Sequence, residues 1–164
     1  MWYADETSFQ QNPNSMYAWQ AKGNTLDLPA KRGNLITVLG FITKDLQKAF
    51  YEFEGSINED LFISIIEDFI VNHLTKKTIL ILDKCSAHTS IKVISKIKQW
   101  KEKNLFIQFL PTASSELNCI EILWKFIKHQ WIAVNDWISA EKLIDSLKNI
   151  LDKFGNEYKI HFKT

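Results

Sequence analysis

Two acidic residues lie where the pattern of the sequence favours a ligand site. Asp83 directly follows the apolar run of residues 78–82, which is typical of a strand buried on both faces. Glu121 lies in a later stretch whose apolar residues recur at helical spacing. The two carboxylates are thus brought towards one edge of a sheet, and the rest of the chain should supply a third.

Each candidate carboxylate also has an ordinary structural interpretation. Asp83 could cap the helix or turn that follows it. Glu121 could form a surface pair with Lys125, which lies four residues further along the same helix. Asp5 could be a strand-edge aspartate, although an unpaired charge among aromatic neighbours is costly to bury. Only the three acids together favour a functional site.

The elements around Asp83 predict a parallel connection. A lysine-rich helical stretch follows it, and a short strand pattern at residues 105–110 ends at Pro111. A strand, a helix and a strand in this order form parallel neighbours joined by a right-handed crossover. The ligand site of such a sheet lies beyond the carboxyl ends of its strands, which is where Asp83 is expected.

The first part of the chain predicts an antiparallel meander. Strand patterns cover residues 1–9, 17–21, 35–43 and, as a short addition, 47–54. Asn58 is a typical N-cap for the helix that follows, and residues 139–154 form a last amphipathic helix. We expect a mixed sheet of the α/β class, with helices on its faces and the first strand in the centre.

Asp5 and Glu6 are neighbours in the middle of the first predicted strand. Because successive side chains of a strand point to opposite faces of the sheet, the two carboxylates must diverge. They cannot both serve one site, so the fold must select one of them.

The composition is that of one globular domain. The chain has 164 residues, 46% of them hydrophobic, and a net charge of +1. Acidic residues concentrate in residues 45–68 and lysines in residues 84–103, where the lysines form either a solvated helix face or a surface for phosphate. The two cysteines favour a reducing, cytoplasmic compartment, and no apolar run is long enough to span a membrane.

Three stretches resemble the catalytic domain of DDE transposases of the bacterial IS630 group, relatives of the Tc1/mariner elements. ADETSF, followed by Trp19 and Gly23, is similar to the first block of that family. ILILDKCSAHTS is similar to the second block, and FLPTASSELNCIEILWKFIK to the third and most specific one. The resemblance covers nearly the whole chain. It implies a ribonuclease H-like fold, with a mixed five-stranded sheet flanked by helices, in a single domain of residues 1–164.

The resemblance also implies a catalytic triad of Asp5, Asp83 and Glu121. These side chains would hold two Mg²⁺ or Mn²⁺ ions roughly 3.5–4 Å apart, which serve the attacking and leaving oxygens of an in-line displacement at phosphate. Asp5 would bridge the ions, and Glu6 would face away from them. The implied activity is metal-dependent DNA cleavage and strand transfer. A stand-alone nuclease and an inactive remnant that regulates DNA or a transposase are the alternatives.

Double-stranded DNA is the partner that the resemblance implies, bound by a homodimer. The expected contacts to DNA are basic side chains: Lys84, His88, Lys92, Lys96, Lys125 and Lys128. We expect this chain to lack the helix-turn-helix segments that precede the domain in the family, and therefore to bind weakly and with little sequence preference.

The chain departs from the family pattern at three positions. Lys84 replaces an asparagine, and Ser115 and Cys119 replace prolines, which would loosen the loop that carries Glu121. Cys85, His88 and Cys119 match a zinc site poorly, because a fourth ligand at suitable spacing is missing.

Overall fold

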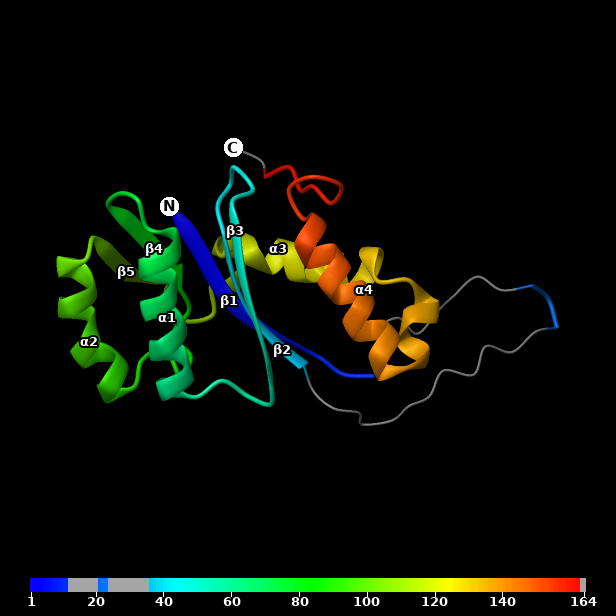
Figure 1. Ribbon diagram of the computed structural model, residues 1–164, viewed down its shortest axis with the longest axis horizontal. Coiled ribbons are helices and arrows are strands. Elements are labelled where there is room, and N and C mark those ends of the chain that lie inside the picture. Colours follow the sequence, from blue (N-terminus) through cyan, green and yellow to red (C-terminus); the bar gives the residue numbers. More distant parts are fainter. Residues whose placement is uncertain (12–20, 24–35, 163–164) are drawn as a thin grey trace.

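A computed structural model describes residues 1–11, 21–23 and 36–162 of the chain (Figure 1). The strands are β1 (Trp2–Phe9), β2 (Ile36–Ile42), β3 (Lys48–Glu54), β4 (Thr78–Leu82) and β5 (Leu105–Phe109). The helices are α1 (Glu59–His73), α2 (Ile91–Glu102), α3 (Cys119–Phe126) and α4 (Ala140–Lys153). Shorter turns of helix cover Ser115–Leu117, Ile127–Trp131 and Val134–Ile138. Among the described residues, every helix is too short or too polar to traverse a lipid bilayer.

The strands form one five-stranded sheet in the order β3-β2-β1-β4-β5. β1, β2 and β3 are antiparallel neighbours, whereas β1, β4 and β5 are parallel ones. This confirms the mixed sheet and the central place of the first strand. The short addition at 47–54 is a full strand, β3. The strand predicted at 17–21 lies, except for Ala21, outside the described residues.

Two apolar cores lie on opposite faces of this sheet. On one face, α1 and α2 bury residues such as Phe62 and Trp100 against Trp2 and Ala4 of β1. On the other face, α3 and α4 pack against Tyr3 of β1. The Asn58 side chain caps α1 by accepting a hydrogen bond from the backbone N–H of its third residue, as the sequence predicted. The alternation along β1 therefore decides which core each of its side chains joins.

The ladder between β1 and β4 is short. It consists of Trp2 opposite Leu80 and Tyr3 opposite Ile81, whereas the β1–β2 ladder continues to the end of β1. Continued by two residues, the β1–β4 register would bring Asp5 level with Asp83. The two strands have separated by that point, so the sheet is forked where the two acids lie.

Candidate active site

The Asp5 side chain is held by the indole of Trp124, which belongs to helix α3. The Trp124 Nε1–H donates a hydrogen bond to Asp5 Oδ2 at 3.1 Å. In the β1–β2 ladder, Asp5 lies opposite Gly40. A Cβ at residue 40 would lie 2.7 Å from the Trp124 ring and 2.9 Å from Ile120 Cδ1, closer than real Cβ contacts. The absence of a side chain at residue 40 therefore makes room for the indole that orients Asp5.

Glu121 lies in the first turn of α3, and Asn118 fixes the start of that helix. The Asn118 side chain is 2% exposed, and its Nδ2 donates to the carbonyl oxygen of Ala4 at 3.0 Å. Its own carbonyl accepts the backbone N–H of Glu121 at 3.0 Å. One buried amide thus ties the start of α3 to β1, one residue before Asp5. This contact anchors the loop in which Ser115 and Cys119 replace the family's prolines.

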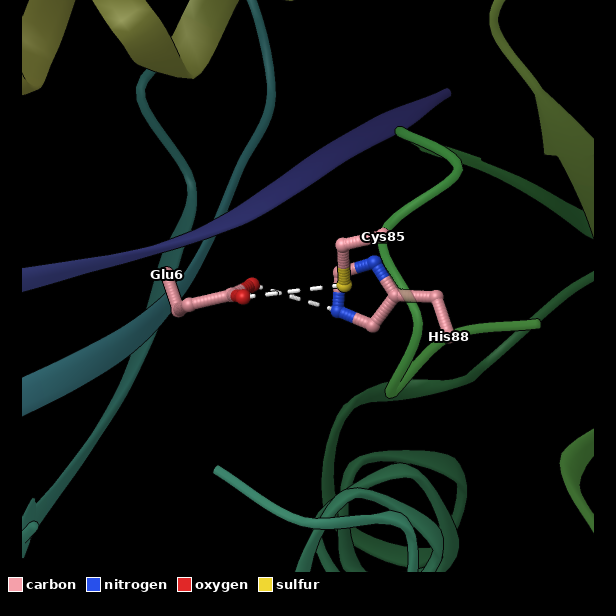
Figure 2. A group of neighbouring side chains, drawn as sticks. All are labelled: Glu6, Cys85 and His88. Atoms are coloured by element: carbon pink, nitrogen blue, oxygen red, sulfur yellow. Dashed lines mark hydrogen bonds and ion pairs between the residues drawn. The ribbon is translucent and has the colours of Figure 1, made fainter. Parts of the chain in front are cut away.

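Asp83 follows β4 and is held by His88. Its Oδ1 lies 2.7 Å from His88 Nδ1 and accepts the backbone N–H of Cys85 at 3.3 Å. The His88 side chain has no exposed surface and packs on the Phe62 ring, with 4.4 Å between the ring centroids. Its Nε2 lies 3.2 Å from Glu6 Oε2 (Figure 2). The imidazole therefore connects Asp83 to Glu6.

The carboxyl groups of Asp5 and Glu121 both have raised pKa values. Burial raises the pKa of Asp5 to about 8, and the charges of Glu121, Glu6 and Asp83 add to the effect. Burial also raises the pKa of Glu121, where Lys128 opposes the shift and Asp83 and Glu6 reinforce it. Such shifts arise where carboxylates are crowded in a poorly solvated place. A bound cation would relieve both.

The electrostatics of Asp83 and His88 are different. The hydrogen bond with His88 holds the pKa of Asp83 below its usual value, although burial opposes it. Burial lowers the pKa of His88, but its interactions with Asp83, Cys85 and Glu6 outweigh this and raise it to about 12. At neutral pH, His88 is therefore an imidazolium between two carboxylates.

Glu121 lies between two hollows of the surface. One, of about 250 Å³, is lined by Asp83, Lys84 and Glu121. The other, of about 380 Å³, is lined by Glu121, Lys125 and Lys128. The structure therefore brings Asp83 and Glu121 to one pocket. Asp5 is near enough to both for their charges to shift its pKa.

The ordinary interpretation of Glu121 is not supported. The ion pairs found among the described residues do not include a Glu121–Lys125 contact, although both residues are described. Glu121 instead lines the pocket that also contains Asp83, and the charge of Asp83 helps to raise its pKa.

The structure adds a contact to the expectation for Glu6 and disagrees with the expectation for His88. Glu6 does lie on the opposite face from Asp5, against His88 and the core of α1, but it is not separate from the site, because His88 joins it to Asp83. The expected DNA contact through His88 does not fit its complete burial, which leaves the ring no access to a phosphate. The sequence could not show either contact, since β1 and the loop after β4 are far apart along the chain.

The expected DNA-binding lysines divide into two groups. Lys92 pairs with Glu59 and Asp60 at 2.9 and 3.2 Å, and Lys96 pairs with Glu67 at 2.9 Å. The acids of α1 thus neutralise part of the lysine-rich face of α2. The second group lines the two hollows beside Glu121 and comprises Lys84, Lys125 and Lys128.

Sequence reasoning missed three residues that position the acids: Gly40, Asn118 and Trp124. Two of them belong to the stretch FLPTASSELNCIEILWKFIK, on which the resemblance rests, and that was the available signal. Their contacts with β1 appear only in the folded chain, because Asn118 bonds to Ala4 and Trp124 to Asp5.

The chain matches one known protein family over most of its length. A family model described as DDE superfamily endonuclease matches residues 1–144. The chain belongs to this family. This confirms the resemblance of the DDE domain to the transposases of the IS630 and Tc1/mariner group. No curated protein matches the chain.

Solved structures of the Mos1 transposase share the fold of this DDE domain. The Mos1 transposase paired-end complex with left transposon end has a TM-score of 0.63 at 13% identity, over 96% of this chain and 49% of that chain. The Mos1 mariner paired end complex with Mn has a TM-score of 0.59 at 17% identity, over 96% and 49%. The fold is ribonuclease H-like. The DDE domain spans about half the length of these structures.

Proposed function

We propose that this chain is the catalytic portion of a DDE transposase. It would cut DNA by hydrolysis at the end of a mobile element and join the freed 3′-hydroxyl to target DNA. The proposal rests on the pocket that Asp83, at the end of β4, and Glu121, at the start of α3, line together, and on Asp5 of β1, which is near enough for both charges to raise its pKa. Membership of the endonuclease family and the likeness to transposase complexes with transposon-end DNA support it.

The residues of this site fit a hard divalent cation. Asp5, Asp83 and Glu121 offer only carboxylate oxygens, which Mg²⁺ and Mn²⁺ prefer. The pKa of Asp5 is raised mainly by burial and further by the charges of Glu121, Glu6 and Asp83, and a bound cation would oppose both causes. Two ions, when bound, would supply an activated oxygen nucleophile and stabilise the leaving oxygen. A similar solved structure, the Mos1 paired end complex, contains Mn.

The other residues of the site act by positioning the acids. Asp5, on the central strand, would hold both ions, and its second oxygen is fixed by the indole of Trp124. Asp83 would hold one ion and is oriented by His88. Glu121 would hold the other and is placed by Asn118. Each acid thus has one neighbour that limits its conformational freedom. Catalysis by positioning requires such restraint, because the reacting groups must already be in place.

Basic side chains around the acids would receive the DNA backbone. Lys84, Lys125 and Lys128 line the hollows on either side of Glu121, where the phosphates next to the cleaved bond would lie. Lys92 and Lys96 would add phosphate contacts only by exchanging their α1 partners. We infer double-stranded DNA as substrate and target. A homodimer would hold the two ends of an element.

The test is metal-dependent cutting of an end-labelled DNA duplex by the full chain. We expect nicking with Mg²⁺ or Mn²⁺ that falls by about 10³-fold, or about 4 kcal/mol, in Asp83→Ala and in Glu121→Gln. Glu116→Gln, a change of an exposed acid in the same loop, is the matched control. Nicking that survives Asp83→Ala would overturn the assignment.

A second readout separates the proposed activity from its alternatives. Products in which the cut strand is joined to a second duplex indicate a transposase, whereas cutting without joining indicates a nuclease. A protein that shows no thermal shift with Mg²⁺, and no cutting, is an inactive remnant. Glu121→Gln should also lose most of the thermal shift that Mg²⁺ gives the parent.

A further inference from the structure

A second group of potential metal ligands lies on the other side of β1 from Asp5. Among the described residues, Glu6, Cys85 and His88 each offer one ligand atom, and these atoms lie within 4.8 Å of one another. Figure 2 shows the three side chains pointing toward one another from β1 and from the loop after β4. They comprise a carboxylate, a thiol and an imidazole, which differs from the oxygen-only triad.

The spacing of these atoms suits a tetrahedral metal ion. His88 Nε2 lies 3.2 Å from Glu6 Oε2, and Cys85 Sγ lies 3.7 Å from Glu6 Oε1. Zinc binds nitrogen and oxygen at about 2.0–2.2 Å and sulfur at about 2.3 Å, so neighbouring ligands of a tetrahedral site are about 3.3–3.7 Å apart. Two edges of such a site are therefore already present.

Two of the ligand atoms are buried without a hydrogen bond. Glu6 Oε2 and His88 Nε2 lack a hydrogen-bond partner, because at 3.2 Å they are close but not aligned for a hydrogen bond. The His88 side chain is fully buried. Buried polar atoms are normally paired, and an ion between these two would satisfy both.

The other ring nitrogen of His88 is already committed. Its Nδ1 lies 2.7 Å from Asp83 Oδ1, which leaves Nε2 to face Glu6 and Cys85. Histidines that bind metals characteristically hold a carboxylate with their second nitrogen, which fixes the ring and makes it a better ligand. Asp83 supplies that carboxylate here.

We propose that Glu6, Cys85 and His88 form a binding site for a transition-metal ion, with Zn²⁺ as the preferred ion. Thiolate and imidazole select zinc and its neighbours over Mg²⁺, which favours the oxygen ligands of the triad. The ligands would be the Cys85 thiolate, the neutral imidazole of His88 and the Glu6 carboxylate, so binding would release the protons that the thiol and the imidazole carry beforehand. Water would take the fourth position.

The structure supplies the third ligand that the sequence did not. Cys85 and His88 are three residues apart in one loop, and Cys119 was the only other thiol to consider. Glu6 comes from the central strand and completes the set across the fork between β1 and β4. An ion there would fasten the loop that carries Asp83 to β1. The inference does not depend on the proposed transposase activity.

The experiment uses Co²⁺ as a spectroscopic probe for zinc, added to the chelator-treated full chain in excess Mg²⁺. We expect one equivalent to bind with the intense near-ultraviolet absorption of a cobalt–thiolate bond, and Zn²⁺ to displace it. Cys85→Ala should abolish this absorption, whereas the matched variant Cys119→Ala should keep it. Glu6→Gln should keep the absorption and weaken binding at least about tenfold.

Three results would overturn the proposal. The first is Co²⁺ binding without thiolate absorption, which would place the ion on the triad or elsewhere. The second is absorption that persists in Cys85→Ala or disappears in Cys119→Ala. The third is an unchanged affinity in Glu6→Gln. None of these measurements involves DNA cleavage, so the site and the transposase activity can fail independently.

Discussion

The two faces of β1 carry acids in opposite electrostatic states. On one face, burial raises the pKa values of Asp5 and Glu121, and the charges of nearby acids reinforce both shifts. On the other face, Glu6 shares the buried imidazolium of His88 with Asp83, whose pKa is lowered. The difference shows that a count of acids does not define a site. What matters is whether the fold also supplies the positive charge.

The contrast begins with the alternation of a strand. Asp5 and Glu6 are adjacent, yet Asp5 meets the indole of Trp124 and Glu6 meets His88, which packs on Phe62. The first pair leaves a carboxylate that needs a cation from solution. In the metal-free protein, the second pair is held by the positive charge of His88 itself.

The largest effect is expected from removing that internal cation. We expect His88→Asn to lower the free energy of unfolding by about 2–3 kcal/mol, because Glu6 and Asp83 lose their shared partner and Phe62 loses a packed ring. Urea unfolding of the metal-free protein measures it. His161→Asn, a change of an exposed histidine, is the control. A loss below about 0.5 kcal/mol would mean that the two faces are not electrostatically different.

The next effect concerns the face of Asp5, through its pH dependence. The pKa of Asp5 is raised from 3.8 to about 8. Between these values the folded protein keeps a proton that the unfolded chain has lost, so the contribution of Asp5 to the unfolding free energy falls as the pH rises. Asp5→Asn should therefore be more stable than the metal-free parent at pH 8, by about 1 kcal/mol or more, and lose this advantage near pH 4.

Urea unfolding of parent and variant at the two pH values measures this difference in unfolding free energy. Asp45→Asn, a change of an exposed acid, serves as the control. A variant less stable than the parent at pH 8 would show that Asp5 is already neutralised in the folded protein.

The smallest effect concerns the lysines, which also differ in whether a side chain of opposite charge already pairs with them. Lys84→Gln should weaken binding to any duplex and reduce the slope of log affinity against log salt by about 1, because Lys84 lines the hollow beside Asp83 without a partner acid in the ion pairs of the described residues. Lys96→Gln should change the slope less, since Glu67 already holds that side chain. A salt titration of binding to a labelled duplex compares them, and equal slopes for both variants would contradict the distinction.

Local pattern was sufficient to predict the mixed sheet, whereas the choice of Asp5, Asp83 and Glu121 as a triad came from the family resemblance and stays a prediction. The apolar run before Asp83 and the crossover after it place that residue at a strand end, and the third motif places Glu121 on a helix. The charge runs at 45–68 and 84–103 were also visible in the sequence. That they neutralise each other was not, because the pairing of Lys96 with Glu67 depends on how α2 packs beside α1.

The contact between Glu6 and His88 was beyond the sequence for a related reason. Strand alternation gives the direction of Glu6, but nothing local says which loop will meet it. The loop after β4 reaches Glu6 because β1 and β4 are parallel neighbours in register, and that is a property of the whole sheet.

Gly40 shows how a residue without chemistry can be as restricted as the acids proposed for catalysis. Any larger residue at this position would displace the Trp124 ring, which is the support of Asp5. In a survey of all substitutions, position 40 would thus score like a member of the triad. Intolerance to mutation would there mark an empty space that the site requires and not a group that reacts.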